Sequence, residues 1–186
     1  MAKSHTKVTK AKDYDGPNKL AAYLSQFKVY PALTSKLDQS AGELNQERIN
    51  EIVLWKVARY VNLPARALAD LNGLKKIKAG EHTQGEAVLK DLLSCDGVRL
   101  PMASTFLRFA NPAVYQIYDR HMWRALYGGL HKINLKKPET AVPLYWEFIE
   151  ELRAQCATLK IDFQNADRIL FQFDKAENPP LSGSED

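Results

Sequence analysis

The sequence has little cysteine, no long apolar run and no segment with the alternating pattern of a β-strand. Its two cysteines, Cys95 and Cys156, lie far apart and cannot form a structural zinc site or a four-cysteine iron–sulfur site. We therefore expect no metal and no cofactor, and the low cysteine content is typical of a reducing cytoplasm. Since no apolar stretch approaches the length that crosses a bilayer, we expect a soluble protein without membrane contact.

Charge of either sign is not in large excess. The 186 residues contain 26 Lys and Arg against 22 Asp and Glu, for a formal net charge of +4. This balance permits binding to a polyanion but does not require it, because strongly basic nucleic-acid binders concentrate more charge on one face. The length predicts a single domain with a substantial core, and we expect a monomer.

The two ends of the chain differ in composition from its middle. Residues 1–15 carry four lysines before any acidic residue, and residues 176–186 are rich in Pro and Ser. We interpret both as mobile tails around one domain at 16–175. The basic N-terminal tail either reaches along DNA phosphates or only aids solubility.

Between the tails, apolar residues recur at helical spacing, which predicts an all-α fold. Pro17 can begin the first helix, since proline is tolerated in a first helical turn. The predicted helices span residues 17–27, 42–61, 64–73, 81–93, 100–110, 120–127, 138–160 and 162–173.

A short turn precedes the helix predicted at 100–110. Gly97 lies where the chain must reverse after a helix ending near Ser94, and glycine tolerates the positive φ of such a turn. Pro101 suits the first turn of the next helix. The free N–H groups of that helix start could hold one phosphate, although an ordinary corner between two helices has the same pattern.

Asp119 stands just before the helix predicted at 120–127. An aspartate at that position is a good N-cap, and the N–H groups it accepts stabilise its ionised form. Capping alone explains many such residues. A carboxylate beside a DNA-binding hairpin can also stabilise developing positive charge or orient an attacking water.

Two segments, Gly97-Val98-Arg99-Leu100-Pro101-Met102-Ala103 and Asp119-Arg120-His121-Met122-Trp123, resemble the helix-hairpin-helix (HhH-GPD) DNA glycosylase superfamily. The second segment is most similar to the 8-oxoguanine DNA glycosylase branch. The resemblance implies a two-lobed helical bundle in which the hairpin grips double-stranded DNA and a damaged or modified base is flipped into a pocket. Asp119 then takes the place of the catalytic carboxylate that supports cleavage of the N-glycosidic bond.

The resemblance also implies contacts with DNA. The expected DNA-binding residues are Gly97, Val98, Arg99, Met102, Ser104, Arg59 and His121. His121 could contact DNA or position the carboxylate, whereas a histidine at a helix start is often only exposed to solvent.

Two positions depart from the family pattern. Pro101 stands where bifunctional members carry a nucleophilic lysine, and proline cannot take that role. Arg99 replaces the second glycine of the hairpin. These changes favour a monofunctional hydrolase with water as nucleophile and no lysine-dependent lyase step of the usual kind. Loss of the chemistry altogether is the alternative.

The helix predicted at 42–61 contains Trp55-Lys56-Val57-Ala58-Arg59, a pattern also similar to small uncharacterised relatives of these glycosylases. Lys56 and Arg59 are neighbours on one helical face and could approach the pocket or the phosphates. Lys56 is thus a candidate catalytic residue, as a displaced amine nucleophile. A solvated basic face beside a buried Trp55 is the other interpretation. We expect Trp123, Trp146, Phe171 and Phe173 in the core.

Three hypotheses follow from the sequence. The first is a monofunctional DNA glycosylase that releases a base by hydrolysis, as in DNA repair by base excision, in the cytoplasm or on a prokaryotic nucleoid. The second is a DNA-binding module that keeps the fold without the chemistry. The third is a helical protein-interaction domain. The sequence leaves open which base is removed and whether the role is genome repair or defence against foreign DNA.

Overall fold

The computed structural model describes residues 9–14, 17–27, 31–39, 43–56, 61, 63–129, 131 and 134–181. Within these ranges there are helices and no strand, so the predicted all-α class is confirmed. The α-helices are α1 (Pro17–Gln26), α2 (Pro31–Gln39), α3 (Gln46–Lys56), α4 (Ala65–Gly73), α5 (Glu86–Ser94), α6 (Leu100–Ala110), α7 (Arg120–Tyr127), α8 (Pro138–Leu159) and α9 (Ala166–Glu177). Short 3-10 turns are η1 (Ala11–Asp13), η2 (Leu74–Lys76), η3 (His82–Gly85) and η4 (Phe163–Asn165).

Most helices agree with the sequence pattern. The bounds predicted for α6 and α7 are those observed, and Gly97 has the positive φ expected of the turn before α6. The sequence analysis missed α2, a helix of 9 residues that begins at Pro31. The helix predicted from residue 42 to 61 begins at Gln46 and is described as far as Lys56, and the predicted stretch at 57–60 lies outside the described residues.

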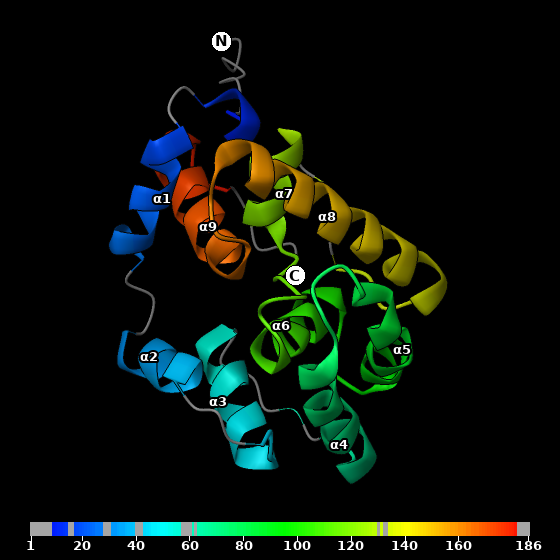
Figure 1. Cartoon of the computed structure of the whole chain (residues 1–186). Coiled ribbons are helices and arrows are strands. Elements are labelled where there is room, and N and C mark those ends of the chain that lie inside the picture. The colour runs from blue at the N-terminus through cyan, green and yellow to red at the C-terminus, as the bar shows by residue number, and fades with distance from the viewer. Residues whose placement is uncertain are drawn as a thin grey trace, which may run out of the picture.

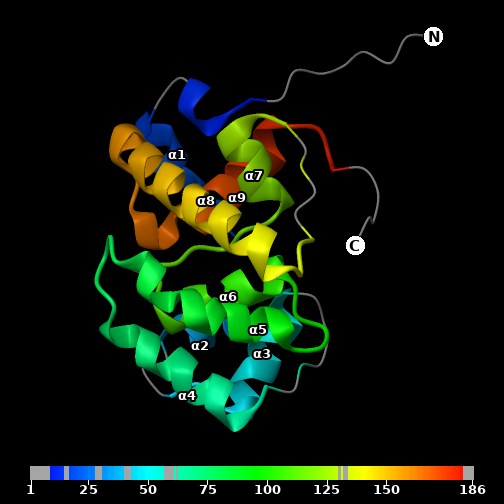
Figure 2. The same cartoon turned by 90° about the vertical axis from the view of Figure 1, so that its right-hand side faces the viewer.

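The helices form two groups (Figures 1 and 2). In one group, α1 and α7 both pack on α9, and α8 lies beside them. In the other, α3, α4 and α5 surround α6, and α2 packs on α3. Contacts of α5 and η3 with α8 join the groups. None of the described helices is long and apolar enough to cross a membrane.

The segment between α6 and α7 is buried although it has no regular structure. Tyr115 and Tyr118 on this segment are fully enclosed by the core. The hydroxyl of Tyr145 on α8 donates to the carbonyl of Gln116 at 2.8 Å, and the N–H of Tyr118 donates to Ser104 Oγ at 3.0 Å. Because its backbone groups are paired in this way, the segment holds the start of α7 in one place.

Residues at both ends of the chain also pack on the body. Ala11 is fully buried, and the Thr9 N–H donates to the buried Asn178 side chain at 2.6 Å. The Pro179 carbonyl accepts a hydrogen bond from Arg124. The packed part of the chain therefore begins before residue 16 and extends beyond residue 175, where the sequence analysis placed the tails.

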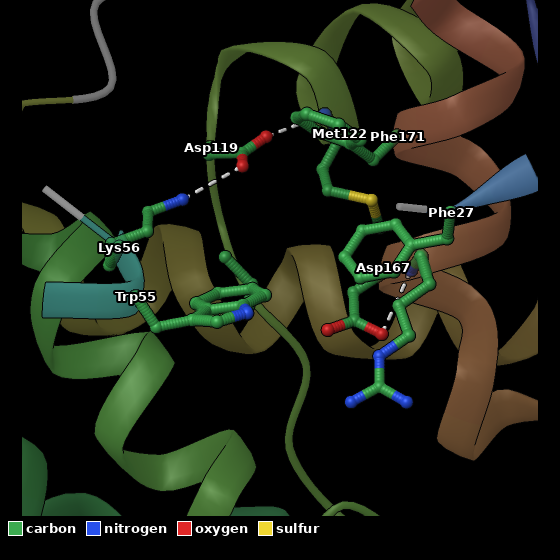
Figure 3. Close-up of a pocket in the computed structure, with 9 residues that line it drawn as sticks. Phe27, Trp55, Lys56, Asp119, Met122, Asp167 and Phe171 are labelled. Carbon is green, nitrogen blue, oxygen red and sulfur yellow. Dashed lines mark hydrogen bonds and ion pairs between the residues drawn. The ribbon is translucent and has the colours of Figure 1, made fainter. Parts of the chain in front are cut away.

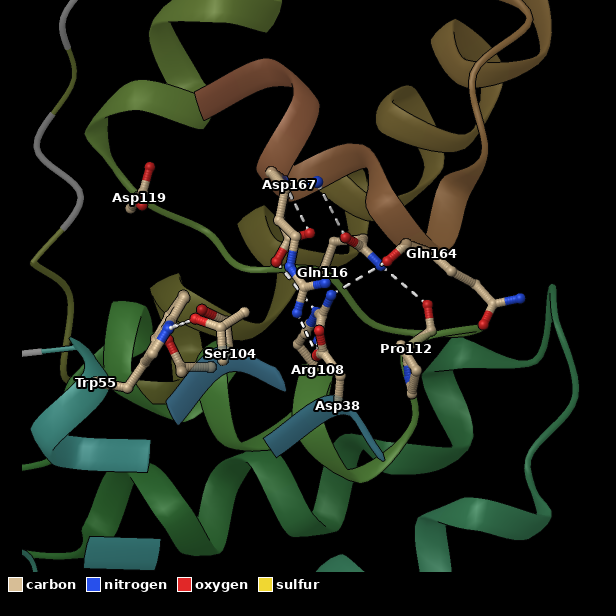
Figure 4. A network of polar contacts seen from close by, with 12 residues as sticks. Asp38, Trp55, Ser104, Arg108, Pro112, Gln116, Asp119, Gln164 and Asp167 are labelled. Carbon is tan, nitrogen blue, oxygen red and sulfur yellow. Dashed lines mark hydrogen bonds and ion pairs between the residues drawn. The ribbon is translucent and has the colours of Figure 1, made fainter. Parts of the chain in front are cut away.

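A buried charge network joins the two helical groups (Figure 4). Arg108 of α6 lies 3.2 Å from a carboxylate oxygen of Asp38 on α2 and 3.1 Å from one of Asp167 on α9. Arg168 of α9 also binds Asp38. Since buried charges are costly unless they are paired, these contacts hold α2, α6 and α9 in register.

Candidate active site

Asp119 is the N-cap of α7, as the sequence predicts. Its backbone is extended, and one carboxylate oxygen accepts a hydrogen bond from the Met122 N–H at 2.9 Å. The preceding residue is held by Ser104 on α6. Backbone on both sides of Asp119 is therefore fixed, and its second carboxylate oxygen points to another partner.

That partner is Lys56, the last residue of α3 (Figure 3). Lys56 Nζ lies 3.0 Å from Asp119 Oδ2, and the two side chains are only 16% and 14% exposed. The pair joins residues 63 positions apart in the sequence and links the two helical groups. Because a charge buried without its partner is costly, the pair fixes both side chains at the pocket, where an ionised carboxylate next to an amine is a candidate catalytic arrangement.

The surroundings of Asp119 keep its carboxyl group ionised. Burial by itself raises the pKa of Asp119, but Lys56, His121 and the Met122 N–H together outweigh burial and lower the pKa below its ordinary value. Asp119 is thus a carboxylate at neutral pH, as charge stabilisation or water activation requires.

A pocket of about 100 Å³ opens beside this ion pair. Three aromatic side chains, Phe27, Trp55 and Phe171, form much of its lining. The other lining residues are Lys56, Ile117, Asp119, Met122, Asp167 and Arg168. The indole N–H of Trp55 donates to Thr34 Oγ1 at 2.6 Å, so this tryptophan presents ring surface to the pocket. The lining suits a planar apolar ring placed next to a carboxylate and an amine.

His121 lies outside the residues that line the pocket, but it packs against the pocket wall. Its Nδ1 is 2.6 Å from Asp174 Oδ2, and Arg124 binds the same carboxylate with two nitrogens. The imidazole ring stands edge-on to Phe171, with the ring centroids 4.6 Å apart. His121 therefore supports Phe171 and is one of the neighbours that lower the pKa of Asp119.

Three residues expected to bind DNA are buried instead. The side chains of Val98, Met102 and Ser104 lie in the core. Ser104 Oγ donates to the Pro101 carbonyl and accepts from the Tyr118 N–H. Because these side chains face the core, contact of these three residues with DNA would have to come from their backbone, and their role in DNA binding stays a prediction.

Gly97 and Arg99 at the hairpin are exposed. The Leu100 N–H at the start of α6 donates to the Leu135 carbonyl at 2.8 Å, and the Arg99 guanidinium reaches the Asn134 carbonyl. The sequence analysis predicted that the free N–H groups at the start of α6 could bind a phosphate. One of them, the N–H of Leu100, is already hydrogen-bonded within the protein. Arg59 lies outside the described residues.

The structure brings together Lys56 and Asp119, two residues proposed from the sequence. It also shows pocket-lining residues that the sequence analysis did not assign to a site. In the sequence analysis Trp55 was only the residue before Lys56, and Phe171 was expected in the core. Phe27, Asp167 and Arg168 gave no signal, because each reaches the pocket through the packing of distant helices. Within the described ranges, no group of His, Cys, Asp and Glu could hold a metal ion.

Comparison of the chain with protein-family models, with curated proteins and with solved structures found no significant match.

Proposed function

We propose that this protein is a DNA base-excision glycosylase that hydrolyses the N-glycosidic bond of a flipped base. The observation that carries the proposal is the Lys56–Asp119 pair at the start of α7, at the edge of a pocket walled by aromatic rings. A nucleobase is a planar ring that stacks on such walls, and its sugar must lie close to the reacting groups. The helical groups on either side of the pocket are the two lobes of a glycosylase-like fold.

Asp119 performs the chemical step in this proposal. As the base departs with the electrons of the C–N bond, positive charge develops on the sugar, and an ionised carboxylate stabilises it. The same carboxylate orients a water that adds to the sugar carbon, and the proton that this water loses passes to the departing base. Lys56 keeps Asp119 ionised and correctly placed through the 3.0 Å contact. Pro101 occupies the place of the usual hairpin lysine, which favours water as the nucleophile.

The hairpin region supplies contacts for the DNA backbone. Gly97 and Arg99 are exposed there, and the exposed Lys136 and Lys137 follow the residue that pairs with the start of α6. Basic side chains near phosphates contribute affinity that falls with rising salt, because bound counterions are released.

The second candidate is a DNA-binding module without catalysis. The paired state of Asp119 favours it, since Lys56 already neutralises the carboxylate that the reaction needs. Both candidates share the DNA contacts, so only a measurement of base release separates them.

The first prediction tests Asp119 directly. Purified protein should create alkali-labile sites in a duplex that carries a modified base, and Asp119→Asn should abolish this while DNA binding is kept. Asparagine retains the N-cap, so the fold should survive. Asp162→Asn is the matched control, because Asp162 is the exposed N-cap of η4 and accepts from the Gln164 N–H.

The outcomes separate the hypotheses. Tight binding without base release across a broad panel of lesions favours the module, and absence of binding at low salt overturns both DNA proposals. Treatment with borohydride during the reaction should leave no protein–DNA cross-link. A cross-link that disappears in Lys56→Arg would instead make Lys56 the nucleophile in place of water.

A further inference from the structure

We propose that the pocket accepts a single-ring base, a pyrimidine, and that Phe27 sets this size limit. The identity of the ligand as a DNA base rests on the proposed function. The size limit itself rests on the shape of the cavity. It departs from the resemblance to 8-oxoguanine glycosylases, whose substrate has two fused rings.

The first argument is volume. The cavity beside Lys56 and Asp119 measures about 100 Å³. An engineered protein cavity of about 150 Å³ holds one benzene molecule, and ligand pockets for larger molecules span roughly 300–1,000 Å³. The volume is therefore closer to that needed by a single six-membered ring than to that needed by two fused rings.

The second argument is that another cavity lies on the far side of the pocket wall that contains Phe27. A second, more open groove of about 280 Å³ lies next to the pocket. Its lining residues are Leu24, Phe27, Thr34, Ser35, Asp38, Gln39 and Arg168. Phe27 and Arg168 line both spaces, so these two side chains form the partition between them. In the view of Figure 3, Phe27 lies on the side of the pocket opposite Lys56 and Asp119.

The partition is braced from several directions. The Phe27 ring centroid lies 6.3 Å from that of Trp55 and 6.1 Å from that of Phe171. The Arg168 guanidinium lies 5.6 Å from the Phe27 ring, and its position is held by Asp38. Moving Phe27 aside therefore disturbs two aromatic contacts and a cation–π contact, each of which stabilises the closed wall.

The polar groups deep in the pocket are already occupied. The Trp55 N–H is paired with Thr34, and the Asp167 carboxylate is paired with Arg108 and with the Arg168 N–H. Few hydrogen-bonding groups remain to read the edge of a base. Selection between bases then depends on their size and on how they stack, and Phe27 in the pocket wall controls the size that fits.

Phe27→Ala tests the proposal by a gain of activity. Loss of the ring should join the pocket to the groove and admit purines. We expect the ratio of purine to pyrimidine release to rise about tenfold or more, since a change of one methylene in an apolar pocket alters discrimination by about 10–200-fold. The rates are measured on matched duplexes that contain a planar pyrimidine foreign to DNA, such as uracil, or a modified purine, such as 8-oxoguanine.

Leu24→Ala is the matched control, because Leu24 lines only the open groove and is 37% exposed. This variant should leave the ratio unchanged. Wild-type release of 8-oxoguanine as fast as of pyrimidines would overturn the size limit while the proposed glycosylase function stands.

A binding measurement keeps the proposal testable if no base is released. Titration of the protein with free uracil and free guanine by calorimetry should show heat only for uracil, and Phe27→Ala should bind both. Equal binding of the two bases, or binding of neither by wild type and variant alike, contradicts the proposal. Selective binding of uracil without base release retains the size limit while the proposed function fails.

Discussion

At the scale of single residues, the site depends on the charge of Lys56, which offsets the effect of burial on the pKa of Asp119. Burial opposes the charge of Asp119, and the neighbouring cation restores it, so that the pKa of the carboxyl group ends below its ordinary value. Neither residue explains the site alone. A lysine at a helix end and an aspartate at an N-cap are common features, and their contact at 3.0 Å inside a pocket makes the pair specific.

This compensation predicts a shift in pH dependence. In Lys56→Gln the burial of Asp119 is no longer opposed by the ammonium, so the pKa of Asp119 should rise. Because the proposed reaction requires the ionised carboxylate, base release should fail at a higher pH than in the wild type as the pH is lowered. The pH–rate profile measures this shift of the acidic limb.

Two comparison variants sharpen the result. Lys56→Arg keeps the positive charge and should keep the acidic limb near its wild-type position. Lys90→Gln removes an exposed lysine that lies 2.6 Å from Glu86 and should leave the limb unchanged. An acidic limb that stays in place in Lys56→Gln would show that another group controls the reaction.

At the scale of elements, the turn between α5 and α6 depends on one backbone conformation. Gly97 has φ +76°, a region that side-chain-bearing residues rarely adopt, and no atom lies within 4 Å of the position that a Cβ would take. Strain, and not crowding, is therefore the cost of a substitution. Since α6 carries Ser104, which holds the backbone before Asp119, the turn and the site are connected.

Gly97→Ala should destabilise the fold by about 1 kcal/mol, because the left-handed conformation costs a residue with a Cβ roughly 1–2 kcal/mol. The free energy of unfolding in urea measures the change. Gly73→Ala is the matched control, since Gly73 lies in α4 with φ −63° and has equal space around it. That change should be neutral or stabilising. Equal losses for both variants would contradict the assignment of strain to Gly97.

At the scale of the whole molecule, the two helical groups meet at a buried network formed by Arg108, Asp38, Asp167 and Arg168. The same network supports the partition of the pocket, because Arg168 both binds Asp38 and stacks on Phe27. The stability of the fold and the shape of the site are therefore coupled.

Arg108→Met should lower the free energy of unfolding by about 3–5 kcal/mol, the range found when one partner of a buried ion pair is removed. Asp167 is then left without its cation, whereas Asp38 keeps its contact with Arg168, so the fall should be smaller if Asp167→Asn is added. Arg66→Ala, which breaks an exposed pair with Asp70, is the control and should change stability little. A small effect of Arg108→Met, measured by urea unfolding, would mean that the network contributes little to holding the groups together.

The sequence by itself determined the features that depend on near neighbours along the chain. The bounds of α6 and α7, the positive φ of Gly97 and the capping role of Asp119 all arise from contacts within a few residues. Periodicity and capping chemistry express those contacts directly, so they can be predicted without a structure.

Only the tertiary structure decided which side chains meet. It placed Lys56 on Asp119, set Phe27 between a small pocket and a larger groove, and buried Val98, Met102 and Ser104. These outcomes join segments tens of residues apart, and local patterns along the chain carry no information on such distances. They follow from how whole helices pack, because packing alone determines which face of each helix is turned inward.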